Sequence, residues 1–152
     1  MLHSHPFTRA GFWLKVGVAG LLAALADALF FLLDGLSPVA APAATLEMVV
    51  STLLENSRQS GASRVRIEAR EAGDLVTLTV SDDGPGVAPA DARRIFEPFF
   101  TTRRGEGGAG LGLSIARALL AANRATLDLR PSDRGAVFEL GLPVSGTTPD
   151  GG

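Results

Sequence analysis

Cysteine is absent from the 152-residue sequence, and its absence excludes disulfide bonds and thiolate metal sites. Histidine is nearly absent too: His3 and His5 are the only two, and they cannot form a metal site by themselves. There is no excess of charge of one sign, because 14 Lys and Arg residues stand against 16 Asp and Glu residues. The basic residues are scattered rather than massed, so we expect no nucleic-acid partner.

Apolar residues and charges divide the chain into four parts. Residues 1–36 form an apolar segment that is predicted to be helical, and residues 37–44 form a linker rich in Ala and Pro. Residues 45–143 are long enough to bury a core and are predicted to be one globular domain. Residues 144–152 show no apolar periodicity and are expected to be disordered.

The globular part alternates between helical and extended patterns. Residues 45–59 place apolar side chains at positions i, i+3, i+4, i+7 and i+8, which predicts an amphipathic helix capped by Thr45. A second helix is predicted for residues 110–123, and a short helical piece for residues 91–96 of a long irregular stretch. The expected fold is α+β, a two-layer sandwich with helices on one face of an antiparallel-rich sheet and an apolar helix before it. The strands of this sheet are predicted at residues 64–70, 75–81, 126–130 and 136–142.

The first helix of the globular part carries an amide at the edge of its apolar stripe. At about 100° per residue, Thr52 and Asn56 lie on one flank of the stripe, whereas Glu55 faces away from it. An Asn in this position can reach a molecule held in a cleft, or it can simply bond to backbone near the helix end. The helix pattern alone leaves both interpretations open.

A glycine-rich loop precedes the second helix. Gly108, Gly110 and Gly112 let the backbone approach a ligand closely, and the unpaired N–H groups at a helix start attract anions. The loop is not a Walker loop, since no Gly-Lys-Ser/Thr follows, and not a Rossmann fingerprint, since no strand leads straight into it. Many glycine-rich loops only make turns, so this one is weak support for a phosphate site by itself.

Four motifs follow one another along the chain: LLEN at 53–56, DDGPG at 82–86, FEPFFTTR at 96–103 and GAGLGLSI at 108–115. This series resembles the N, G1, F and G2 boxes of the ATP-binding domain of sensor histidine kinases, in the gyrase/Hsp90/histidine-kinase/MutL superfamily. The resemblance covers residues 45–143 and implies the Bergerat ATP-binding fold, truncated here at its first strand. It also implies ATP and Mg²⁺ as cofactors and a role in two-component phosphorelay signalling.

The resemblance implies a role for individual residues. Asp82 matches the carboxylate that accepts the adenine amine, with Gly84 and Gly86 giving the base room, and a buried acceptor distinguishes adenine from guanine. Asn56 matches the Mg²⁺-binding amide, whose oxygen suits an ion held jointly with phosphates. The other residues implied to bind the nucleotide are Thr102, Arg103, Gly108, Gly110, Leu111 and Gly112.

The residues between the second and fourth motifs read as a lid. We expect residues 88–109 to be mobile without a ligand, and within them Arg103 and Arg104 either pair with phosphate or are ordinary solvated charges. Asp83 is expected to be a turn residue. A packing role is expected for Phe96, Phe99 and Phe100.

Two departures from the family narrow the implied activity. Thr52 stands four residues before Asn56, where gyrase-like and Hsp90-like members place a water-activating Glu, and this disfavours an ATP-hydrolysing machine. No phosphoacceptor block is found, since His3 and His5 lie in a polar leader. We therefore expect no catalytic residue here: the chain binds Mg-ATP and passes the γ-phosphoryl to a histidine of a separate dimerisation domain, which serves a response regulator. The alternatives are a truncated, non-catalytic ATP-binding module and a protein-serine kinase of the anti-sigma type.

The apolar segment at residues 12–33 is close to the roughly 20 residues that span a bilayer. Lys15 and Asp27 interrupt it, and an Asp near the centre of a span costs about 2.5–3.5 kcal/mol. Arg9 and Lys15 at its start against Asp34 at its end would keep the N-terminus in the cytoplasm and put a single span's ATP site outside. We expect a cytoplasmic ATP-binding domain, associated with the inner membrane through residues 12–33, in a remnant or fusion of a larger kinase.

Overall fold

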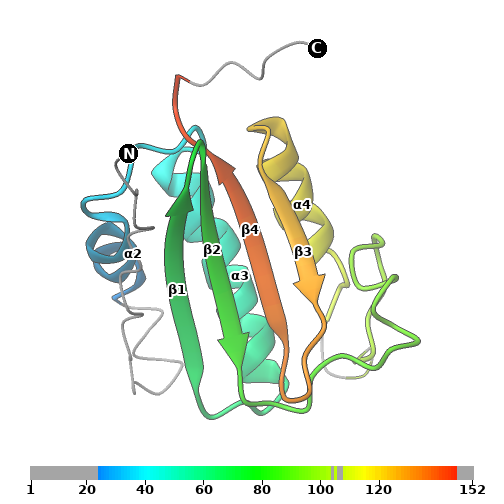
Figure 1. The fold of residues 1–152 in the computed structure, drawn as a ribbon. Coiled ribbons are helices and arrows are strands. Elements are labelled where there is room, and N and C mark those ends of the chain that lie inside the picture. The colour runs from blue at the N-terminus through cyan, green and yellow to red at the C-terminus, as the bar shows by residue number, and fades with distance from the viewer. Residues whose placement is uncertain (1–23, 104, 106–107, 147–152) are drawn as a thin grey trace.

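The structure is a computed structural model that describes residues 24–103, 105 and 108–146. Four strands form one antiparallel sheet in the order β1-β2-β4-β3 (Figure 1). The strands are β1 (Val65–Ala72), β2 (Leu75–Asp82), β3 (Thr126–Arg130) and β4 (Val137–Pro143). The register pairs Val65 with Asp82 on one side of β2, while Val80 of β2 lies opposite Phe138 of β4.

Two helices cover one face of this sheet, α3 (Ala43–Gln59) and α4 (Gly112–Ala122) (Figure 1). The core lies between the two layers, because alternate strand residues point at the helices and are buried. The predicted apolar stripe of α3 is buried throughout, and the α+β two-layer fold expected from the sequence is confirmed. The stripe consists of Leu46, Val49, Val50, Leu53 and Leu54.

A third helix, α2 (Leu25–Leu33), packs against α3 and β1 beside the sheet edge (Figure 1). Leu25 and Leu29 are buried in this contact, whereas Phe30 and Phe31 keep 78% and 64% of their surface exposed. Within the described residues no helix is both long and apolar enough to cross a membrane. The first part of the segment 12–33 lies outside the described residues.

The helix boundaries differ from the prediction in three places. Thr45 is not the cap of α3: the helix begins at Ala43 after Pro42, whose fixed φ suits a helix start, and no side chain caps it. The second helix begins at Gly112 rather than residue 110, because Gly110 has a φ of +69°. Residues 91–96 form turns instead of a short helix, since the few bonds there, such as Ile95 N–H to the Asp91 carbonyl, do not propagate.

The connector before α3 is held to the end of β4. Val39 forms an isolated antiparallel bridge with Val144, although no strand was expected ahead of this helix. Ser145, the second residue of the predicted tail, donates its N–H to the Pro38 carbonyl at 2.6 Å. Ser37 donates from its N–H and its hydroxyl to the carboxylate of Glu71 on β1. Residues 147–152 of the predicted tail lie outside the described residues.

Candidate functional site

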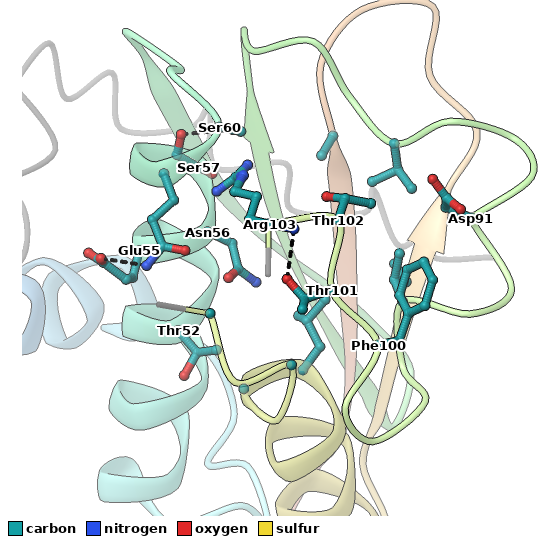
Figure 2. A pocket seen from close by; sticks show the side chains of 18 of the residues that line it. Thr52, Glu55, Asn56, Ser57, Ser60, Asp91, Phe100, Thr101, Thr102 and Arg103 are labelled. Carbon is teal, nitrogen blue, oxygen red and sulfur yellow. Dashed lines mark hydrogen bonds between the residues drawn. The ribbon is translucent and has the colours of Figure 1, made fainter. Parts of the chain in front are cut away.

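A cavity of about 630 Å³ opens between α3 and the segments that join β2 to α4 (Figure 2). Its walls come from the polar flank of α3, the end of β2, residues 86–88, Asp91, Ile95, residues 100–103 and 108–113, and the start of β4. All residues that the sequence assigned to nucleotide binding line this cavity except Gly84. The structure thus brings residues of all four motifs, which are spread over positions 53–115, to one cavity.

Asp82 at the end of β2 is held from three directions. Its Oδ1 accepts the backbone N–H groups of Gly84 at 3.0 Å and Ala136 at 3.1 Å. Its Oδ2 accepts the hydroxyl of Ser57 at 2.7 Å. An ionised carboxylate offers about four lone-pair sites, so these three donors leave about one of them for a further donor.

The glycines beside Asp82 allow close backbone contacts. A Cβ on Gly84 would lie 3.2 Å from Oδ1 of Asp82, so Gly84 supports the carboxylate instead of lining the cavity. Gly86 has a φ of +76°, and a Cβ there would lie 2.9 Å from the carbonyl oxygen of Gly135. The neighbouring Asp83 is the expected turn residue: it accepts the N–H groups of Ser63 and Arg64. The Arg64 N–H is the main reason that the pKa of Asp83 is lowered.

Asn56 faces the cavity from the polar flank of α3, next to Thr52 (Figure 2). Its amide has no hydrogen-bond partner among the residues that the structure describes. Asn56 is therefore not occupied with local backbone, which was the alternative open from the sequence. The amide oxygen is available to a ligand.

Glu55 points away from the apolar stripe and yet lines the rim of the same cavity. Its carboxylate accepts hydrogen bonds from the Arg58 guanidinium and from the side-chain amide of Gln59. These bonds, chiefly the one from Arg58, lower the pKa of Glu55 from 4.5 to about 2. The rim of the cavity beside Asn56 therefore carries an ion pair between Glu55 and Arg58.

The glycine-rich loop is fitted tightly to its surroundings. A Cβ on Gly110 would lie 2.6 Å from the carbonyl carbon of Phe99. The N–H of Phe99 donates a hydrogen bond to the carbonyl oxygen of Gly110 at 2.8 Å. A Cβ on Gly112 would lie 3.1 Å from the Thr52 side chain, which brings the start of α4 against α3. No side chain caps α4, so its first N–H groups and the positive end of its dipole suit an anion.

A family model of histidine kinase-, DNA gyrase B- and HSP90-like ATPases matches residues 42–146. The chain belongs to this family. It is 36% identical over 102 residues to the alginate biosynthesis sensor protein KinB of Pseudomonas aeruginosa, a match of 65% of this chain and 17% of that protein. It is 38% identical over 117 residues to the two-component sensor PprA of the same species, covering 70% of this chain and 13% of that protein. It is 36% identical over 104 residues to the sensor protein RstB of Escherichia coli, a match that covers 65% of this chain and 24% of that protein.

Solved structures agree with this family. The catalytic domain of the histidine kinase ThkA, in a nucleotide-free form, matches with a TM-score of 0.59 and 27% identity over 68% of this chain and 70% of that one. Full-length ShkA in complex with AMPPNP matches with a TM-score of 0.61 and 27% identity over 92% of this chain and 33% of that one. The chain spans less than a quarter of the length of the three sensor relatives. The resemblance drawn from the four motifs is thus confirmed.

Thr102 and Arg103 of this ATPase-family domain lie over the cavity. Arg103 donates its backbone N–H to Oγ1 of Thr101 at 3.0 Å, and its side chain extends towards α3 (Figure 2). Arg104, the second arginine of the predicted lid, lies outside the described residues. A Cβ on Gly108 would lie 3.2 Å from Oγ1 of Thr101, so the first glycine of the glycine-rich loop is in contact with the third motif.

The packing role predicted for the three phenylalanines fits two of them. Phe96 meets Phe138 edge to face at 6.4 Å between centroids, and the Arg117 guanidinium lies 4.5 Å from its ring centre. Phe100 lines the cavity beneath Arg94, whose guanidinium lies 4.5 Å from that ring centre. Phe99 was predicted to pack and does not, because its positive φ of 66° turns the ring outward and leaves it 66% exposed.

Some residues of the ATPase-family site were missed by sequence reasoning. Ser57 is 4% exposed and is the only buried polar residue in the described part of the chain. Its signal was its position: it lies four residues after Leu53 and so falls on the apolar stripe. Gly135 was predicted as a turn residue and Ala136 as the start of a strand, and neither prediction indicated a contact with Asp82, because only the folded sheet brings these residues to it. No cluster of three or more metal-binding side chains occurs within the described ranges.

Proposed function

We propose that this domain binds Mg-ATP and transfers the γ-phosphoryl group to a histidine of a separate dimerisation domain, which then serves a response regulator. The observation that carries the proposal is the state of Asp82. Its carboxylate is fixed by Ser57, Gly84 and Ala136, and about one acceptor site is left for a ligand in the cavity. A fixed acceptor recognises the exocyclic amine of adenine without reorganising on binding.

The phosphate end of the nucleotide would lie towards the start of α4. Gly108, Gly110 and Gly112 line the cavity there, and the uncapped N–H groups of the helix suit phosphate oxygens. Arg103 contributes a cation beside this loop, since a Cβ on Gly108 would lie 3.6 Å from the Arg103 carbonyl oxygen. Arginine binds phosphate through several donors at once, so this residue fits the lid role that the sequence left undecided.

A magnesium ion fits the same end of the cavity. The amide oxygen of Asn56 is a hard ligand, and its side chain is unengaged in the described residues. Magnesium keeps several waters and shares its coordination with substrate phosphates, so one protein ligand is sufficient. Bound there, the ion would neutralise charge on the phosphates during transfer.

The chemistry expected of this chain is positioning. Phosphoryl transfer depends mainly on alignment and on charge neutralisation rather than on covalent steps at the protein. Asp82 and the glycine loop would set the two ends of ATP, while the attacking histidine comes from the partner domain. Transfer to a histidine elsewhere in the same chain is not required.

The test is to mix the protein with dimerisation domains of two-component sensors and γ-labelled ATP, and to look for phosphohistidine. Label that is lost in acid and kept in base supports the proposal. ATP binding without label in any partner would favour a non-catalytic binding module. Label that survives acid as phosphoserine would favour the anti-sigma type of kinase, and absence of ATP binding would remove the proposal altogether.

We also propose that the ATP-binding domain is cytoplasmic and associated with the inner membrane through residues 12–33. Two observations support association: the apolar composition of that segment and the exposure of Phe30 on α2. Membrane fractionation of cells that produce the full chain, beside a variant lacking residues 1–23, tests it. Equal recovery of both forms in the soluble fraction would argue against the anchor.

A further inference from the structure

Ser57 is a buried partner of Asp82, the carboxylate that we propose recognises adenine. The residue lies on α3 beside Asn56, and its hydroxyl donates to Oδ2 of Asp82 at 2.7 Å. Both Ser57 and Asp82 line the cavity. Figure 2 shows Ser57 close to Ser60. No motif that carried the family resemblance assigns a role to Ser57.

The single proton of Ser57 decides what this wall offers a ligand. A serine hydroxyl has one O–H donor and two acceptor lone pairs. The proton is committed to Asp82, so the serine oxygen presents only lone pairs towards the cavity. Two acceptors, Oγ of Ser57 and Oδ2 of Asp82, therefore lie 2.7 Å apart with no free proton between them.

We propose that Ser57 is a positioning residue that keeps this end of the cavity free of donors and so sets the preference for adenine over guanine. The inference rests on the proposed binding of ATP and deepens it. The exocyclic amine of adenine carries two protons and matches two neighbouring acceptors. The corresponding atom of guanine is a carbonyl oxygen, which finds no donor here and would lose its hydrogen bonds to water unpaired.

A water molecule in place of the hydroxyl would undo this restriction. Water has two protons, so it can donate one to Asp82 and turn the other towards a guanine carbonyl. Removing the hydroxyl with Ser57→Ala opens a small polar site next to Oδ2, which is suited to such a water. Ser57 therefore contributes more by limiting donors than by adding one bond.

A purely structural role for Ser57 makes a different prediction. If the hydroxyl only satisfies Asp82, its loss lowers stability and weakens every nucleotide equally. If it sets the donor pattern, its loss weakens ATP and also narrows the gap between ATP and GTP. The ratio of the two dissociation constants separates these cases, because a general loss of stability cancels from it.

The experiment compares the full-length wild-type protein with Ser57→Ala and with Ser60→Ala as the matched control. Ser60 also lines the cavity, but its hydroxyl donates to the Ser57 carbonyl at 2.8 Å and not to Asp82. Calorimetric titration with Mg-ATP and Mg-GTP gives both dissociation constants, and circular dichroism verifies that each variant is folded.

We expect Ser57→Ala to weaken the binding of ATP by about fivefold or more. The ratio of the dissociation constants for GTP and ATP should fall by about tenfold, which is the scale of one hydrogen bond to a charged group. Ser60→Ala should keep the wild-type preference. An unchanged ratio in Ser57→Ala, or an equal change in Ser60→Ala, would overturn the role of Ser57 while leaving ATP binding in place. Failure of the wild-type protein to bind ATP would overturn the proposed function itself.

Discussion

Gly135 lies directly against the backbone of Asp82: a Cβ placed on Gly135 would come within 1.7 Å of the Asp82 carbonyl oxygen. The contact brings the turn between β3 and β4 onto the end of β2. The next residue, Ala136, donates its N–H to Oδ1 of Asp82 and accepts the Asp82 N–H at 3.0 Å. A residue that follows Asp82 by 54 positions thereby helps to orient the Asp82 carboxylate.

Gly135→Ala should damage both folding and nucleotide binding. The new methyl group cannot fit without moving the turn away from Asp82, and the φ of +70° is strained for any L side chain. Gly73→Ala is the matched control, because Gly73 has a φ of +62° but nothing lies within 4 Å of its Cβ position. The control should lose only the strain energy of about 1–2 kcal/mol. Urea unfolding and ATP titration measure both effects, and equal losses in the two variants would contradict the steric argument.

Asp82→Asn should abolish most ATP binding. One amide oxygen cannot accept all three donors that now meet the carboxylate, and the NH₂ group would face one of them or the adenine amine. Loss of a buried acceptor costs about 1–3 kcal/mol. Asp83→Asn is the control, since Asp83 holds the N–H groups of Ser63 and Arg64 and does not line the cavity. A calorimetric titration in which Asp82→Asn bound ATP like the wild type would show that the motif is misassigned.

The sequence was sufficient to predict the layers of the fold and, through the four motifs, nine of the residues that line the cavity. The periodic spacing of apolar residues predicted the buried stripe of α3 and the four strands, because an element that is buried on one face repeats apolar residues with its own period. It could not reveal that Gly135 supports Asp82, because that contact depends on the pairing of β4 with β2. The exposure of Phe99 was also not predicted, since it follows from a positive φ at a residue whose backbone lies against Gly110.

Asn56→Ala should uncouple ATP binding from magnesium. In the wild-type protein, removal of Mg²⁺ with EDTA is expected to weaken the binding of ATP, because the ion would link the triphosphate to the amide oxygen of Asn56. Without that oxygen the affinity should be lower and should change much less on adding EDTA. Gln59→Ala provides the control, since Gln59 lines the cavity but bonds Glu55. An EDTA effect of wild-type size in Asn56→Ala, measured by titration with ATP, would remove Asn56 as the ligand.

Glu71→Gln should lower stability at neutral pH and make little difference in acid. The hydroxyl of Ser37, and next its backbone N–H, lower the pKa of Glu71 from 4.5, so the Glu71 carboxylate stabilises the folded state wherever it is charged. This contribution is complete above pH 4.5 and is lost as the pH falls through the lowered pKa. Urea unfolding between pH 7 and pH 3 should therefore show the two proteins converging below about pH 4.5. Glu47→Gln, an exposed change on α3, is the control, and a constant gap between Glu71→Gln and wild type would contradict the linkage.

ATP should order the predicted lid, residues 88–109, more than ADP does. The γ-phosphate gives Arg103, which already lines the cavity, and Arg104 an anionic partner that ADP lacks. Limited trypsin digestion reports this as slower cleavage after Arg103 and Arg104, with fragments identified by mass spectrometry. Rates should fall in the order no nucleotide, ADP, non-hydrolysable ATP analogue.

A pair of variants separates the lid arginine from general stabilisation by the ligand. Arg103→Gln should reduce the difference in protection between the ATP analogue and ADP at the remaining site, Arg104. Arg93→Gln, an exposed change in the same segment that does not line the cavity, should keep the wild-type order of rates. Equal cleavage of the wild-type protein under all three conditions would mean that nucleotide does not close this segment, and residues 88–109 would then be an idle loop rather than a lid.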